Sequence, residues 1–190
     1  MKLIIASNNK HKIKEIKEIL GSKFSEILSL KEAGIDHETV EDGMSFSENA
    51  YKKAREIAEI SGEASLADDS GICIDALDGA PGVFSARFAG EHGNDELNNS
   101  LVLEKLKGTK DRGAHYTAAI SLVYPDGRHV SSLGHLYGDI TETPRGDKGF
   151  GYDPLFVVRG EKRTVAEMSE EEKNAISHRR QALDALLEKI

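Results

Sequence analysis

The sequence predicts an α/β fold in which a mixed β-sheet is flanked by helices. Three observations predict it. Short apolar runs alternate with segments of helical periodicity, a strong turn signal joins two β-rich segments, and no repeat or linker interrupts the 190 residues. Alternating strands and helices favour parallel pairing, whereas a hairpin is antiparallel, so the sheet should be mixed. We expect a single domain over residues 1–190.

The first third of the chain should contain one strand and two helices. Residues 3–6 form an apolar run that is typical of a buried strand. From residue 10 onward, isoleucines recur with a helical period until Gly21 ends the pattern. A second helix should begin at Ser45, because Glu48 follows at the spacing of a capping box.

The middle of the chain carries a strand with an unusual interruption. Residues 66–77 are largely apolar, but residues 68–71 within them read Asp-Asp-Ser-Gly. A third helix is expected over residues 94–106. A single closing helix is expected from Ser169, which again has a capping-box partner in Glu172, to the end of the chain.

A hairpin is expected before that closing helix. Residues 116–124 and 129–140 are rich in β-forming residues, and the sequence Pro-Asp-Gly at 125–127 is a strong turn signal. A glycine-containing loop over 144–154 should then lead to a short strand at 155–158.

Composition excludes several classes of protein. There are 33 acidic and 25 basic residues, so the net charge of −8 offers no basic excess for binding long nucleic acid. Cys73 is the single cysteine, which excludes an intramolecular disulfide and a cysteine-based zinc cluster. No apolar run could span a bilayer and no secretory signal is visible, so we expect a cytoplasmic protein without a membrane partner. A small anionic ligand remains compatible with this charge.

A polar segment between the first strand and the first helix could bind phosphate. The amide groups and the positive dipole end of a helix attract anions, and lysines add charge. The P-loop pattern is absent, and the segment also fits a polar surface loop. Its residues are Ser7, Asn8, Asn9, Lys10, His11 and Lys12.

Two adjacent carboxylates, Asp68 and Asp69, interrupt the apolar strand. Burying them requires a metal ion or strong hydrogen bonds, and carboxylate oxygens suit Mg²⁺. If the strand continues through both, they point to opposite faces. Glu41 and Asp42 are candidates for a further ligand, although Asp-Ser-Gly is also ordinary turn chemistry. The same tripeptide occurs in aspartic proteases, but these need two copies and the chain has one.

Two further segments could recognise a base. Residues 149–154 carry Phe150 and Tyr152 among glycines, and such aromatics either stack on a base or fill the core. Near the C-terminus, several donors fall on the expected closing helix, where they could contact a base or form a solvated surface. These donors are Lys173, Ser177, His178 and Arg179. Taken together, the four segments are the parts of a Mg²⁺-dependent nucleotide hydrolase.

In their order along the chain, these segments resemble the inosine triphosphate pyrophosphatase family. The resemblance covers nearly the whole chain and implies hydrolysis of abnormal purine nucleoside triphosphates (ITP, dITP and XTP) to the monophosphate and pyrophosphate, which clears damaged nucleotides from the pool. It also implies Mg²⁺, a homodimer, and an elongated mixed sheet with two lobes and a central cleft. The segments that carry it are residues 6–12, residues 41–43 with 46 and 48–50, residues 67–71, residues 79–82 with 85–87, residues 149–154, and residues 172–173 with 177–179.

The resemblance also implies a role for individual residues. Residues 7–12 would hold the triphosphate, with Lys12 as the main cation, and Glu41 and Asp69 would bind Mg²⁺. Asp69 would activate the attacking water, and Asp68 could share either duty. Residues that would contact the rest of the nucleotide are Ser70, Phe150 as the stacking ring, Gly151, Tyr152, Asp153, Lys173, His178 and Arg179. Lys10 and His11 are not fixed members of the family pattern, and Tyr152 replaces a tryptophan of some relatives.

The sequence leaves two other functions open. One is a pyrophosphatase for modified pyrimidine nucleotides, which would differ in the base pocket rather than in the phosphate chemistry. The other is a non-catalytic nucleotide sensor, which the presence of Glu41, Asp68 and Asp69 disfavours. The residues also leave open which of the two adjacent aspartates accepts the proton.

Overall fold

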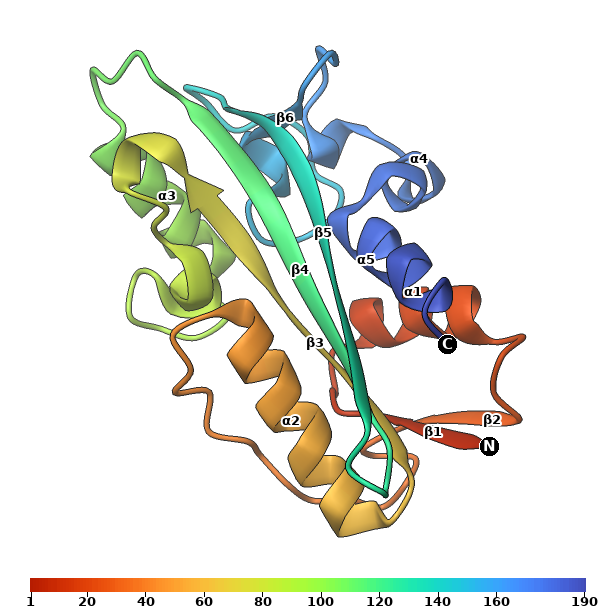
Figure 1. Cartoon of the computed structure of the whole chain (residues 1–190). Helices are drawn as coiled ribbons and strands as arrows, with labels where there is room; N and C mark the ends of the chain where they lie inside the picture. Colours follow the sequence, from red (N-terminus) through yellow and green to blue (C-terminus); the bar gives the residue numbers. More distant parts are fainter. The chain divides into compact units, whose positions relative to one another are not determined.

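The computed structural model describes residues 1–190 and contains one six-stranded mixed sheet with helices packed on it (Figure 1). The strand order is β2-β1-β3-β4-β5-β6, with β1 parallel to β2 and β3 and with β6 antiparallel to β5. The strands are β1 (Lys2–Ile5), β2 (Glu26–Ser29), β3 (Ala64–Ile74), β4 (Gly113–Val123), β5 (His129–Ile140) and β6 (Phe156–Val158). The helices are α1 (Lys10–Leu20), α2 (Phe46–Ser61), α3 (Asp95–Lys105), α4 (Glu170–Ile176) and α5 (His178–Leu187). The predicted α/β class is confirmed.

The chain forms two compact units from interleaved segments. Unit 1 comprises residues 1–69, 118–134 and 178–190, and unit 2 comprises residues 70–117 and 135–177. The strands β3, β4 and β5 each carry residues of both units, so no linker separates them. A single domain over the whole chain stays a prediction.

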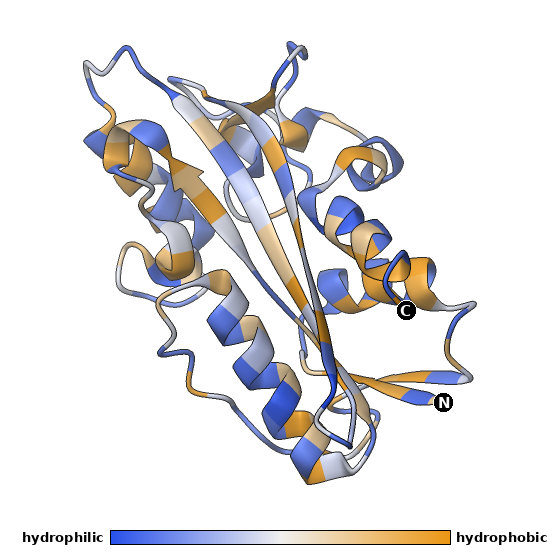
Figure 2. Cartoon of the chain, viewed as in Figure 1, coloured by the Kyte–Doolittle hydropathy of each residue, from blue (hydrophilic) through white to orange (hydrophobic).

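In unit 1 the sheet is covered on both faces, as the apolar β1 requires. Leu3 and Ile5 pack with residues of α1 and α5, whereas Ile4, which points to the opposite face, packs with residues of α2. Strands buried on both faces lose the alternation of polar and apolar residues. Figure 2 accordingly shows β1 as hydrophobic beyond its first residue, while α2 carries both hydrophilic and hydrophobic residues.

In unit 2 the core lies on one face of the strands. Ile72 of β3, Tyr116 of β4 and Leu136 of β5 belong to one buried cluster with Val102 of α3 and Phe156 of β6. Alternate residues of each strand therefore point to this face of the sheet. No helix of the chain is both long and apolar enough to cross a membrane.

Helix α2 begins at the capping box predicted from the sequence. The Ser45 hydroxyl accepts a hydrogen bond from the Glu48 amide at 3.2 Å, and the Glu48 carboxylate accepts one from the Ser45 amide, which completes the capping box of α2. Gly62 ends α2 with a φ of +68°. The hairpin of β4 and β5 and the third helix are also confirmed.

Two predictions about element boundaries were wrong. β3 runs without interruption through residues 68–71, and residues 75–77 form a short 3-10 helix instead of extending the strand. The closing helix is two helices, because Ser177 adopts an extended conformation with ψ of 149° between α4 and α5. In both places tertiary burial of charged side chains overrides the local pattern, as the site geometry shows below. The short edge strand β2 was not predicted.

Candidate active site

In the polar segment at the start of α1, two backbone amides donate hydrogen bonds to a capping side chain of the same segment. The Asn9 side chain accepts hydrogen bonds from the amides of His11 at 3.0 Å and Lys12 at 3.2 Å. The Ser7 hydroxyl accepts one from the Asn9 amide at 3.1 Å. Asn8 and Lys10 lie exposed beside them. A bound phosphate would therefore depend on the lysine charge and the helix dipole more than on the two capped amides.

Asp68 is the centre of a buried ion-pair network in unit 1. One carboxylate oxygen contacts the Lys12 ammonium, and the other accepts a hydrogen bond from Arg179 Nε at 2.9 Å. Arg179 Nη1 donates to Glu15 Oε2 at 2.7 Å. Asp68 and Arg179 are 2% and 3% exposed. Two cations and two anions from α1, β3 and α5 thus neutralise one another away from solvent.

The network fixes the charge of Asp68. Burial by itself would raise the pKa of this carboxyl, but the positive charges of Arg179 and Lys12 outweigh burial and hold it far below its usual range. For Arg179, burial opposes the charged form, yet Asp68 and Glu15 raise the guanidinium pKa above its ordinary value. Asp68 is therefore a permanent carboxylate whose oxygens are committed to cations of the protein.

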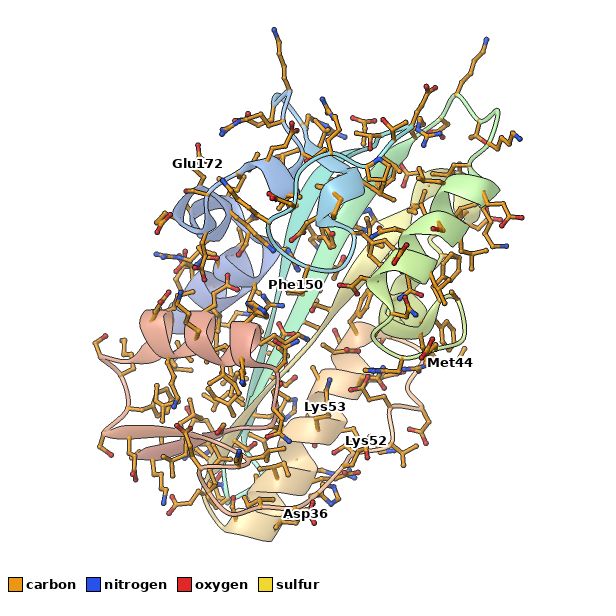
Figure 3. All side chains as sticks on the ribbon, turned by 180° about the vertical axis from the view of Figure 1, so that it is seen from behind. Asp36, Met44, Lys52, Lys53, Phe150 and Glu172 are labelled. Atoms are coloured by element: carbon orange, nitrogen blue, oxygen red, sulfur yellow. The ribbon has the colours of Figure 1, made fainter.

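Asp69, the next residue of the same strand, has different surroundings. Successive strand residues point to opposite faces, so Asp69 faces α2 rather than α1 and α5. Lys53 of α2 (Figure 3) donates to Glu41 Oε1 at 2.8 Å and lies 3.5 Å from Asp69 Oδ1. Asp69 Oδ2 is buried and has no hydrogen-bond partner. Burial, together with the nearby Glu41 charge, raises the Asp69 pKa, although Lys53 opposes the rise.

The two carboxylates beside Lys53, those of Glu41 and Asp69, fit a divalent cation that is held jointly with phosphate. No group of three or more His, Cys, Asp or Glu side chains converges anywhere in the chain, so an all-protein metal cage is absent. Glu41 and Asp69 both reach the Lys53 ammonium, which shows that one cationic centre can serve both carboxylates, and Asp69 keeps an orphaned oxygen. Mg²⁺ is usually held by one or two carboxylates plus substrate phosphate. The residues present match that donor set.

In unit 2, Phe150 is 36% exposed on the loop between β5 and β6 (Figure 3). The Lys173 ammonium lies 4.3 Å from the Phe150 ring centroid. Asp153, expected to contact the nucleotide, is 3% exposed. Its carboxylate accepts hydrogen bonds from the Phe150 amide at 3.0 Å, the Tyr116 hydroxyl at 3.3 Å and Lys173. Its carboxylate therefore holds the loop that presents Phe150.

The rest of this loop is held by hydrogen bonds within the same unit. The Gly151 amide donates to Asp95 at 2.6 Å, and the Gly151 carbonyl accepts from Asn99 at 2.9 Å. Tyr152 is 4% exposed, and its hydroxyl donates to the Ser85 carbonyl at 2.7 Å. Of the two aromatics, Tyr152 thus fills the core, whereas Phe150 is partly exposed to solvent.

Gly149→Ala is expected to destabilise the protein by about 3 kcal/mol. Gly149 has a φ of +76°, which costs a non-glycine residue about 1–2 kcal/mol, and an added Cβ would lie 2.1 Å from Asp153 Oδ2, which adds a packing penalty. Denaturant unfolding measures the difference. Gly160→Ala is the matched control, because φ is +88° but the space is open, and it should lose only the conformational part. Equal losses in the two variants would contradict the proposed close packing.

The C-terminal donors are divided between two helices and do not all lie on one. Lys173 belongs to α4 and pairs with Asp153, whereas His178 and Arg179 begin α5 and belong to unit 1. Arg179, expected to contact the base, donates hydrogen bonds to Asp68 and Glu15 of the protein. Ser70 follows Asp69 in β3 and is partly buried.

Three polar residues of the site were not predicted from the sequence: Glu15, Asn49 and Lys53. Asn49 and Lys53 are four residues apart on α2, and Asn49 is 1% exposed. A polar residue within the apolar face of a helix was the available signal, since Ala50, Ala54 and Ile57 follow around it. Lys53 and Glu15 carried no such signal, because charged residues are common in helices.

Comparisons with known proteins match the chain over its whole length. A model described as the Ham1 family matches residues 3–189. A dITP/XTP pyrophosphatase of Clostridium perfringens is 52% identical, with 100% of this chain and 97% of that protein covered, and one of an Exiguobacterium species is 49% identical, with 98% and 95% covered. Among solved structures, the Ham1 protein of Staphylococcus aureus has a TM-score of 0.91 at 39% identity and 100% and 99% coverage. A HAM1 protein of Coxiella burnetii has the same TM-score and identity, with both chains fully covered.

Proposed function

The chain belongs to the Ham1 family, and from that premise we propose that it hydrolyses dITP, ITP and XTP to the monophosphate and pyrophosphate. The resemblance drawn from the six sequence segments is thereby confirmed. Full-length relatives that share about half of its residues are named dITP/XTP pyrophosphatases. These names support the substrate class, and the geometry of the site supports the chemistry.

The observation that carries the proposal is the contrast between two neighbouring carboxylates. Asp68 is locked into ion pairs with Lys12 and Arg179, whereas Asp69 has a raised pKa and an orphaned oxygen beside Glu41. A general base works best when its pKa approaches the operating pH. We therefore assign the proton of the attacking water to Asp69, and to Asp68 the task of holding Lys12 and Arg179 in place.

Charge neutralisation accounts for the phosphate chemistry. Attack at the α-phosphate makes pyrophosphate the leaving group, so its growing negative charge must be stabilised. The Lys12 and Lys53 side chains, both largely buried, carry the positive charges of unit 1 that meet this need. Mg²⁺, held by Glu41 and Asp69, would add positive charge at the phosphate oxygens when bound.

Recognition of the base is assigned to the loop of unit 2. Phe150 would stack on the base, with Lys173 as the adjacent donor. Deaminated purines present a carbonyl at position 6, whereas adenine presents an amino group that would leave a buried donor unpaired. A thousandfold preference needs only about 4 kcal/mol, which a hydrogen-bonding site can supply. Ser70 and His178 keep their predicted contacts with the nucleotide as part of the proposal.

Three finer properties belong to the same proposal: dependence on Mg²⁺, a homodimer, and action in the cytoplasm on the nucleotide pool. For the dimer, an aromatic surface offers support. Tyr137 of β5 is 49% exposed, and its ring lies 5.4 Å from that of His115 and 6.0 Å from that of His135. Light scattering on the purified protein tests the dimer directly.

The test of the function is a product assay with purified protein and Mg²⁺. ITP, dITP and XTP should yield monophosphate and pyrophosphate, while ATP, GTP, CTP and UTP should react far more slowly. Removing Mg²⁺ with a chelator should abolish turnover, and adding it back should restore turnover.

Other product patterns would contradict the proposal in distinct ways. Nucleoside diphosphate and phosphate would place the attack at the γ-phosphate. Turnover restricted to modified pyrimidine nucleotides would indicate the other pyrophosphatase class. Binding of ITP without any turnover would identify a sensor.

A further inference from the structure

Asn49, in the first turn of α2, has a buried carboxamide against both parts of the proposed metal site. Its side chain is 1% exposed, and it carries one acceptor and one donor group that burial removes from water. Buried polar groups are normally paired, so each of its two ends needs an explanation.

The acceptor end fastens the loop that carries Glu41. Asn49 Oδ1 accepts a hydrogen bond from the Gly43 amide at 2.8 Å, two residues after Glu41. A Cβ at Gly43 would lie 2.6 Å from that oxygen and 2.9 Å from the Glu48 Cβ, so only glycine allows this approach. The side chain of Asn49 thus ties the preceding loop to α2 immediately beside a proposed metal ligand.

The donor end faces the other proposed ligand. Asn49 Nδ2 and Asp69 Oδ2 are both buried without a hydrogen bond of normal geometry. Burial raises the Asp69 pKa, and the Asn49 amide is among the groups that oppose this rise, so the two side chains are near neighbours. Burying an unpaired donor or an unpaired acceptor of this kind costs free energy. A cation on Asp69 would satisfy the oxygen alone.

We propose that Asn49 is a positioning residue that holds the Glu41 loop through Gly43 and orients Asp69, so that both carboxylates are presented to one divalent cation. The inference rests on the proposed function, since it concerns the metal carboxylates of that site. Both halves of the amide are required. An aspartate would lose the donor and repel Asp69, and a leucine of similar size would lose donor and acceptor together.

The experiment compares Asn49→Leu with Asn98→Leu. Asn98 is an equally buried asparagine, 2% exposed, whose amide binds the backbone at Ala89 and Ala86 in unit 2. Mn²⁺ affinity is measured by electron paramagnetic resonance with excess inorganic phosphate in place of the substrate phosphate, and exchange of the Gly43 amide by NMR. Asn49→Leu should weaken Mn²⁺ binding 10–100-fold and speed Gly43 exchange at least ~10-fold, as expected for an outer-sphere partner of a metal site. Asn98→Leu should leave both unchanged.

Gly43→Ala provides a second route if Asn49→Leu does not fold. Its Cβ would push Asn49 Oδ1 away, so Mn²⁺ binding should weaken while every polar group of Asn49 and Asp69 remains. Wild-type-like Mn²⁺ affinity in folded Asn49→Leu or Gly43→Ala, or an equal loss in Asn98→Leu, would overturn the role of Asn49 alone. A wild-type protein that binds no Mn²⁺ would overturn the metal site itself. The two failures are therefore distinguishable.

Discussion

Asp69→Asn should reduce turnover of ITP on the order of 10⁴-fold while leaving the free energy of unfolding nearly unchanged. The substitution keeps the size of the side chain but removes the group that accepts the proton and the charge that binds Mg²⁺. Because Asp69 Oδ2 has no protein partner and its carboxyl already has a raised pKa, the fold does not depend on its ionised form. Steady-state kinetics with Mg²⁺ and ITP, together with urea unfolding, measure the two effects separately.

Asp42→Asn is the matched control for this prediction. Asp42 adjoins Glu41 in the acidic loop, but its side chain is 68% exposed and pairs with Lys52 at 2.7 Å. Removing its charge changes the net charge by the same amount and should alter turnover less than about threefold, since exposed ion pairs contribute little. Near-wild-type turnover of Asp69→Asn would remove Asp69 from the chemistry.

The parts of the fold that could be predicted are those with short-range causes. The capping box at Ser45 and Glu48, the turn at 125–127 and the period of α1 depend on residues a few positions apart, and all of them appear in the structure. The order of the functional segments also sufficed to identify the family. The contacts between these segments could not be derived from their spacing in the sequence.

The missed features have long-range causes. Two carboxylates in a strand look like a turn unless their partners are known, and the partner of Asp68 in α5 is 111 residues away. The same contact explains the break at Ser177, because α5 must begin where Arg179 can enter the core beside Asp68. The spacing of apolar residues predicts neither the contact between Asp68 and Arg179 nor the break at Ser177. Lys53 was not predicted because a lysine on a helix is common, and its two carboxylate partners become evident only in the structure.

Asp68→Asn should lower the free energy of unfolding at pH 7 by about 3–5 kcal/mol. Its carboxylate is the shared anion of Lys12 and Arg179, and an amide would leave excess positive charge buried with Glu15 as the remaining counter-ion. The folded-state pKa of Asp68 is depressed by these cations, so its stabilisation is fully present above the unfolded pKa of about 3.9. The difference between wild type and variant should therefore narrow as the pH falls below about 4. Urea unfolding at several pH values measures it.

Asp184→Asn is the control for loss of an ion pair in the same helix. Asp184 pairs with Arg180 at 2.8 Å, but both side chains are nearly half exposed, so the loss should stay below about 1 kcal/mol.

The variants of the adjacent residues Asp68 and Asp69 should therefore differ in which property they lose. Asp69→Asn loses turnover and keeps stability, whereas Asp68→Asn loses stability first and loses turnover only as far as Lys12 is displaced. A stable but inactive Asp68→Asn would reverse the assignment, because it would show that the buried ion pair is dispensable for folding and that its carboxylate acts in the reaction.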